Sequence, residues 1–285
     1  MASKADLRRR IRSVKSTQQI TKAMKMVAAA KLRRAQQRIV EARPYAATLQ
    51  GMLASLVSRL PAAHPLLEQR PERHVTLVAI TGDKGLCGAF NANVLRETYL
   101  LLRRGWEQVD LILVGRKGAD FFRARGVGVQ AHHADAMRHP SAAAATAFAR
   151  DLADRFADRR TDAVYFVYNQ FRSVILQRVT VERWLPVDTS DLVGGGVAPR
   201  CLLEPSAPSL LHRLLPRHLQ FGVLRIQLDS AAAEHAARMT AMDAASKNAV
   251  EMIDRLTLTY NRLRQASITK ELIEIVSGAQ ALAER

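Results

Sequence analysis

The first 43 residues carry a regular pattern of apolar and small side chains and contain neither Gly nor Pro. The pattern advances by alternating steps of four and three residues, through Leu7, Ile11, Val14, Gln18, Thr21, Lys25, Ala28, Leu32, Ala35, Ile39 and Ala42. This spacing is typical of a coiled-coil seam and predicts one long helix. We expect Pro44 to kink or interrupt that helix, and residues 45–60 to form a further helical piece that ends at Pro61.

A second stretch without Gly or Pro runs from Val223 to Ser277, although residues 224–228 are also compatible with a strand or a loop. The three-four spacing returns at Met239, Met242, Ser246, Ala249, Ile253, Leu256, Tyr260, Leu263 and Ser267. A long helix with a narrow apolar stripe cannot bury that stripe alone, so the two terminal helices are predicted to pair. Because both helices join the same central segment, the pair is expected to be an antiparallel coiled coil. Separate packing of each helix onto a bundle is the alternative, but the many alanines favour close packing of two helices.

The middle of the chain has a different pattern, in which short β-branched and aromatic runs alternate with helix-like segments. The runs are residues 75–81, 109–114, 163–168 and the neighbourhood of 179–181, and the helical segments are 92–104, 117–125 and 141–159. This alternation predicts an α/β domain with a parallel sheet. Residues 191–216 are rich in Gly and Pro and are expected to form an irregular connection. The predicted domains are therefore residues 1–60, 61–216 and 217–285.

The net charge of +17 is concentrated at the N-terminus, where residues 1–43 hold thirteen Lys or Arg and only two acids. A basic stripe of this kind suits nucleic acid, anionic lipid or an acidic protein surface, and charge alone does not choose between them. A targeting peptide has a similar composition, but the apolar pattern continues in one register to Ala42. No apolar run reaches the roughly 20 residues that a membrane-spanning helix needs.

Candidate chemistry is sparse. Residues 81–91 form a Gly-rich turn between a predicted strand and a predicted helix, but Gly82, Gly85 and Gly88 fit neither the P-loop nor the dinucleotide-binding spacing. A tight turn with close helix–strand packing is the favoured interpretation, and the same holds for residues 115–118. Cys87 and Cys201 are predicted to be reduced thiols. His132 and His133 are adjacent and point apart, which does not support a metal site. From these motifs together we expect no catalytic residues, no metal and no cofactor.

Longer motifs at both ends and in the centre resemble those of the γ subunit of F-type ATP synthases. Residues 20–32 (ITKAMKMVAAAKL) are similar to the N-terminal signature of that family, and residues 264–279 (RQASITKELIEIVSGA) are similar to its C-terminal signature. Residues 234–245 and the run DKGLCG at 83–88 also fit the family, which usually has Arg where Lys84 stands. Residues 132–216 match only loosely.

The resemblance implies a bacterial-type rotor shaft, with an antiparallel coiled coil and a Rossmann-like α/β domain that has no nucleotide site. The expected partners are the α and β subunits of the catalytic hexamer, the ε subunit and the membrane c-ring, at the cytoplasmic face of the bacterial inner membrane. Met24 and Lys25 would face an acidic lever loop of the β subunits, and Arg264 and Gln265 would contact a second β-subunit loop. Ser267 and Lys270 are polar positions in the same C-terminal stretch and are also expected to face a partner protein.

Two other classes of function remain as alternatives. A basic coiled-coil nucleic-acid binder would explain the charge, but residues 1–43 contain no aromatic side chains to interleave with it. A dinucleotide-dependent enzyme would use the central domain, and the glycine spacing disfavours it. The family resemblance also implies that no thiol regulation is expected, because the inserted dithiol segment of the chloroplast type is missing.

Overall fold

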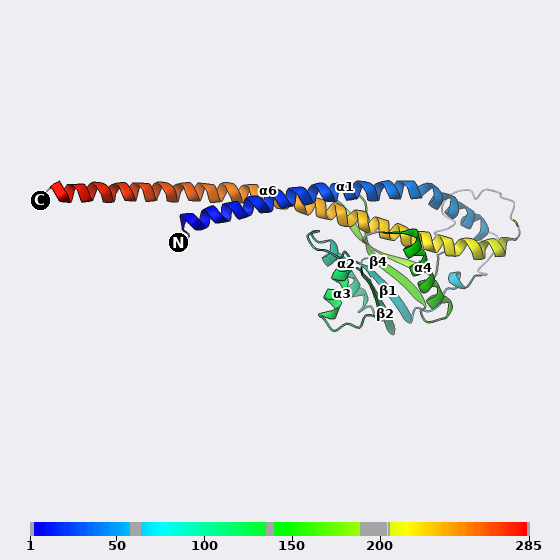
Figure 1. Ribbon diagram of the computed structural model, residues 1–285. Coiled ribbons are helices and arrows are strands. Elements are labelled where there is room, and N and C mark those ends of the chain that lie inside the picture. The colour runs from blue at the N-terminus through cyan, green and yellow to red at the C-terminus, as the bar shows by residue number, and fades with distance from the viewer. Residues whose placement is uncertain (1–2, 58–63, 135–139, 189–203, 205, 284–285) are drawn as a thin grey trace. The chain divides into compact units, whose positions relative to one another are not determined.

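The computed structural model describes residues 3–57, 64–134, 140–188, 204 and 206–283 of the 285-residue chain (Figure 1). The chain forms two compact units, one of Met1–Val27 with Ala241–Arg285 and one of Ala28–Thr240. Two long helices, α1 (Lys4–Val57) and α6 (Ala207–Ala283), contribute residues to both units.

In the first unit, α1 and α6 pair along the predicted seam and run antiparallel. The Nζ of Lys4 donates to the Oγ of Ser267 at 2.7 Å, whereas Lys25, further along α1, bonds Asp243, which lies earlier in α6. The seam positions of both helices in this unit are all buried or partly buried, with Leu7 and Met242 each 4% exposed. The predicted coiled coil is therefore confirmed, and its buried positions are those that the sequence indicates.

Of the kink or interruption expected at Pro44, the interruption is wrong, because α1 continues through this proline to Val57. Pro44 and Val40 are both exposed, so the carbonyl group of Val40, which loses its helical donor, can be hydrated instead. Figure 1 shows that the last turns of α1 are curved and that the helix is not broken there. Residues 58–61 of the predicted second piece lie outside the described residues.

The irregular connection expected to reach Pro216 is also shorter than predicted, because α6 already begins at Ala207 and includes residues 224–228. Pro208 stands in its first turn, where a missing N–H does no harm. The reason for the helix is a buried stripe at helical spacing, with exposed fractions of 2% or less at Leu211, Leu215, Leu219, Val223 and Ile226. Burial of this stripe outweighs the helix-breaking tendency of Pro216.

The second unit contains a five-stranded sheet in the order β3-β2-β1-β4-β5. Its strands are β1 (His74–Ile80), β2 (Gln108–Val114), β3 (Ala131–His133), β4 (Ala163–Phe171) and β5 (Gln177–Leu185). The predicted parallel pairing holds for β1 with β2 and with β4, and β3 is a short parallel strand that the sequence did not reveal. β5 is antiparallel to β4, since the short connection of residues 172–176 permits only a hairpin.

Helices cover both faces of this sheet (Figure 1). Leu77 and Ala79 of β1 face a core shared with α2 (Phe90–Leu101) and α3 (Arg116–Arg123). The alternate residues Val78 and Ile80 face α4 (Ala142–Ala157), the short helix η1 (Pro65–Leu67), and the parts of α1 and α6 that belong to this unit. The result is a three-layer, Rossmann-like α/β body, as predicted.

Candidate functional site

Lys25, the cation expected to meet an acidic loop, already has a partner in the helix pair. Its Nζ lies 2.6 Å from the Oδ1 of Asp243, and the Nζ of Lys247 lies 3.0 Å from the Oδ2 of the same carboxylate. Hydrogen bonds from Lys25 first and Lys247 second lower the pKa of Asp243. The cluster is partly exposed, with 44% of the Lys25 side chain accessible, and it keeps one net positive charge. Met24 beside it is partly buried.

The other predicted contact residues lie in the opposite part of the helix pair. Arg264 and Gln265 are both exposed on α6. Ser267 accepts its bond from Lys4 and donates to the Oε1 of Glu271 at 2.9 Å. Lys270 is exposed and lies 3.5 Å from Glu274. Sequence reasoning missed Lys4 and Asp243, because their roles depend on the register between two distant segments of the chain.

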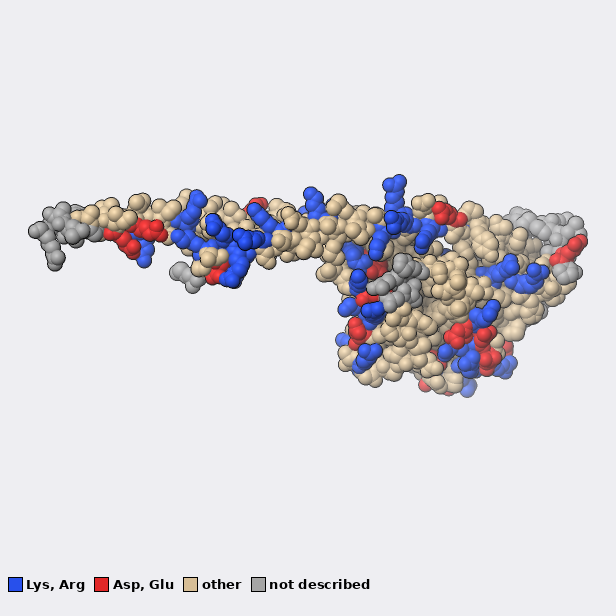
Figure 2. Space-filling model, in the orientation of Figure 1, with Lys and Arg blue, Asp and Glu red and all other residues tan. Residues whose placement is uncertain are grey.

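Past Ser267, α6 has no partner helix among the described residues, and its positions 268–277 are all exposed. Several large apolar side chains lie there, with exposed fractions of 48–67%: Ile268, Leu272, Ile273, Ile275 and Val276. Exposed apolar groups of this kind are typical of surfaces that contact another protein. The basic N-terminal part of α1 is visible in Figure 2 as a concentration of blue side chains.

The Gly-rich turn after β1 joins the α/β body to α6 of the same unit. A Cβ at Gly82 would lie 3.1–3.2 Å from the carboxylate of Glu234, so the backbone and this side chain pack closely. Arg238 bonds Glu234 at 2.6 Å and donates to the carbonyl oxygen of Gly85 at 3.3 Å. Glu234 and Arg238 had no visible role in the sequence, because the turn that they hold lies about 150 residues away.

The second Gly-rich segment is also used for packing. Gly115 has a φ of +93°, and a Cβ there would lie 2.0 Å from the carbonyl oxygen of Thr81. The backbone N–H of Gly118 donates to the Oγ1 of Thr81 at 2.9 Å. Close strand–helix packing is thus the reason for these glycines.

The titratable groups noted in the sequence are packed into the fold. Burial raises the pKa of the Cys87 thiol, which keeps it protonated and poorly nucleophilic at neutral pH. Burial likewise lowers the pKa of His133, whose ring packs edge-on against Phe148. Cys201 lies outside the described residues. No group of three or more potential metal-ligating side chains occurs in the part of the chain that the structure describes.

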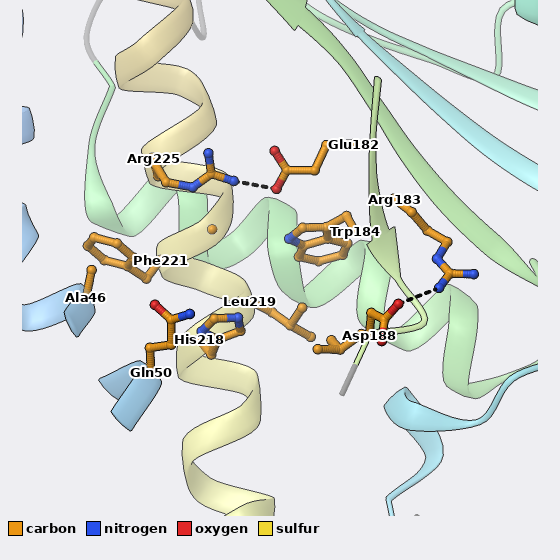
Figure 3. A pocket seen from close by; sticks show the side chains of 12 residues that line it. Ala46, Gln50, Glu182, Arg183, Trp184, Asp188, His218, Leu219, Phe221 and Arg225 are labelled. Carbon is orange, nitrogen blue, oxygen red and sulfur yellow. Dashed lines mark hydrogen bonds and ion pairs between the residues drawn. The ribbon is translucent and has the colours of Figure 1, made fainter. Parts of the chain in front are cut away.

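A cavity of about 250 Å³ lies between α1, α6 and the end of β5 (Figure 3). Arg225 and Glu182 point toward one another on one side of it and form an ion pair. The hydroxyl group of Tyr168 donates to Glu182 at 2.7 Å, and burial raises the pKa of Tyr168. This network holds α6 against the antiparallel edge of the sheet, and burial lowers the pKa of His218, which lines the same cavity.

Comparisons with known proteins place these features in a family. Residues 3–282 match the family model described as ATP synthase. The chain is 48% identical over 289 residues to the ATP synthase gamma chain of Anaeromyxobacter sp. (strain Fw109-5), with 99% of this chain and 100% of that protein covered. It is also 48% identical over 287 residues to the gamma chain of Solibacter usitatus (strain Ellin6076), with 99% of each covered.

Solved structures of ATP synthases are similar to this chain as well. A chain of the central stalk and c-ring structure of the Tetrahymena thermophila mitochondrial ATP synthase matches with a TM-score of 0.64 and 28% identity, covering 80% of this chain and 99% of that one. A chain of the Euglena gracilis mitochondrial ATP synthase, at 21% identity and a TM-score of 0.68 over 98% of this chain and 94% of that one, shares the fold. An antiparallel helix pair and a Rossmann-like body thus define a central-stalk protein. The chain belongs to the family of ATP synthase gamma chains. None of its described helices has an apolar stretch long enough to cross a membrane.

Proposed function

We propose that this gamma chain is the non-catalytic rotor shaft of a bacterial ATP synthase. It would couple rotation of a membrane c-ring, driven by protons or sodium ions, to conformational change at the catalytic β subunits. The observation that carries the proposal is the antiparallel helix pair of the first unit, closed by Lys4–Ser267 and by Lys25–Asp243. Two helices joined along a continuous seam resist twisting better than one helix, as a torque-bearing shaft requires.

The chain would divide its work between its parts. Residues 1–60 and 217–285 would form the shaft inside a hexamer of α and β subunits, and residues 61–216 would form the body that binds the ε subunit and the c-ring. In this arrangement the chain would lie at the cytoplasmic face of the inner membrane as a peripheral protein. The lack of a membrane-spanning helix among the described residues is compatible with that location.

The positions of the candidate contact residues are compatible with this proposal, although Lys25 already has a partner in Asp243. An ammonium group has three donors, so Lys25 can bond an acidic lever loop of a β subunit while it keeps Asp243. Met24 would pack against the same loop. Arg264 and Gln265 are exposed and available to a second β-subunit loop, and Ser267 and Lys270 border that surface.

A non-catalytic role is supported by the state of the reactive groups. The Cys87 thiol is 1% exposed, has a raised pKa and bonds Asn91 rather than a base. The Gly-rich turns after β1 and β2 are used for packing. We therefore assign hydrolysis and synthesis of ATP to partner subunits.

Reconstitution tests the proposal. The full chain is mixed with α and β subunits of a related bacterial ATP synthase, and complex formation and ATP hydrolysis are measured. We expect a stoichiometric complex with one gamma chain per hexamer and faster turnover than without it. Arg264→Gln should reduce that turnover, whereas Arg262→Gln, an exposed arginine two residues away, serves as the matched control and should not.

Failure of the folded chain to join competent subunits would overturn the proposal. Steeply salt-dependent DNA binding in place of assembly would favour the basic nucleic-acid binder instead. Equal effects of the two arginine variants would contradict the assigned contact but not the rotor function.

A further inference from the structure

A basic groove of about 460 Å³ lies in the second unit, outside the residues assigned to the shaft contacts. It is bounded by α1, by the turn after β1 and by α6. Five cations line it: Lys31, Arg34 and Arg38 from α1, Lys84 from the turn, and Arg238 from α6. Two carboxylates, Asp83 and Glu234, also line it, so the groove has a formal excess of three positive charges.

The two carboxylates are already engaged. Asp83 accepts a bond from the backbone N–H of Arg116 at 3.1 Å, and Glu234 accepts one from Arg238 at 2.6 Å. By contrast, Lys31, Arg34, Arg38 and Lys84 form no ion pair with any of the described residues. These four exposed cations give the groove a positive potential that attracts an anion.

His235 gives a second observation, which is an unpartnered polar atom in a residue that lines the groove. Its Nδ1 is buried in the wall of the groove and has no hydrogen-bond partner among the described residues. Burial first, and then the charges of Arg238 and Lys31, lower the pKa of His235 to about 4. The imidazole is therefore neutral at pH 7, and a buried polar nitrogen without a partner is costly unless a ligand or water satisfies it.

The position of the groove in the fold is that of a ligand site. Asp83 and Lys84 follow the carboxyl end of β1, which pairs with β2 on one side and with β4 on the other. In open α/β sheets, ligands bind outside the carboxyl ends of the strands at such a switch in strand order. In this chain the carboxylate of Glu234 packs against Gly82, so the phosphates of a dinucleotide cannot approach that glycine in the usual way. What remains beside it is a basic groove suited to a small oxyanion.

We propose that this groove binds a phosphate-class oxyanion, either inorganic phosphate or the phosphate groups of a nucleotide, through Lys31, Arg34 and Lys84. The bound anion links α1 with the turn after β1, because Lys31 and Arg34 belong to α1 and Lys84 belongs to the turn. Binding therefore stabilises the attachment of the α/β body to the part of α1 that belongs to the same unit.

The test uses the isolated full chain, so it does not depend on assembly with other subunits. Inorganic phosphate and, separately, ADP are titrated calorimetrically at constant ionic strength, and the melting temperature is followed in parallel. We expect saturable binding, which Arg34→Gln and Lys84→Gln each weaken by roughly fivefold. The matched control is Arg33→Gln, which removes an exposed cation from the next position of α1, outside the groove, and should leave binding within about twofold.

The outcomes are distinct. Tighter binding of ADP than of phosphate identifies a nucleotide as the source of the phosphate group, and equal or weaker binding of ADP identifies free phosphate. No saturable binding of either probe, or equal weakening by Arg33→Gln and Arg34→Gln, overturns the proposal. As a second readout, phosphate should raise the pKa of His235 in NMR titrations of the wild type, because a nearby anion favours the imidazolium.

Discussion

Replacement of Leu32 by alanine tests whether the two long helices depend on close packing in the second unit. Leu32 is 4% exposed and packs against Ala232 and Ala236 of α6, both 0% exposed. Leu→Ala changes in cores cost about 2–5 kcal/mol, depending on how far the site can collapse. Ala232 and Ala236 have no flexible side chain to fill the space, but partly buried neighbours such as Met239 can move in. We therefore expect a loss near the lower end, about 2–3 kcal/mol.

The assay is differential scanning calorimetry of the full chain. An unfolding entropy of about 2.1 cal/mol/K per residue converts the expected loss into a melting temperature roughly 3–5 °C lower. The control is Arg33→Ala, at the next and exposed position of the same helix, which should melt within about 1 °C of the wild type. If Leu32→Ala melted together with that control, Leu32 would not be held between the helices and the packing argument would be wrong.

Three further predictions concern single groups. Gly115→Ala should lower the free energy of unfolding in urea by at least about 3 kcal/mol, because its Cβ would overlap a carbonyl oxygen. The control Gly126→Ala, with φ of +66° and no atom within 4 Å, should lower it by only about 1 kcal/mol, and similar losses for the two variants would contradict this argument. The folded-state pKa of Asp243 is lowered from 3.8, so the contribution of this carboxylate to stability is present at neutral pH and is lost as pH falls through the lowered pKa. Asp243→Asn should remove this part of the acid dependence of the melting temperature, and an unchanged dependence on pH would refute the argument. Burial and the bond to Glu72 raise the pKa of Tyr165 to about 12, so Glu72→Gln should move its ultraviolet titration toward 10, and no shift would count against that bond.

Most of the fold was predictable because its stabilising contacts follow local periodicity. The steps of four and three residues fixed which side of α1 is buried, and Leu7, Ala28 and Leu32 are among the least exposed residues of that helix. The buried strands β1, β2 and β4 were equally visible as continuous apolar runs.

Prolines were the main source of error. Pro44 and Pro216 are inside helices that propensity alone would end. Burial of a whole apolar stripe, such as the one that includes Leu215, is worth more than the roughly 3 kcal/mol that an interior proline costs. No sequence rule shows which apolar stripes will find a partner. The short strand β3 has too few residues to carry a period-two pattern.

The candidate contact residues could be located but not described from the sequence. Lys25 was recognisable as a polar position on the seam, but its bond to Asp243 joins residues 218 positions apart. The close packing of Glu234 against Gly82 likewise joins residues that are far apart in the sequence. Pairings of this kind depend on the register of two helices and on the sheet that carries the turn.

The most direct test of the rotor is observation of rotation in a single reconstituted complex. The α and β subunits are fixed to a surface, a visible probe is attached to the exposed body of this chain, and ATP is added. We predict unidirectional rotation of the probe that stops when ATP is withdrawn. Steady ATP hydrolysis by complexes whose probe stays still would contradict the account.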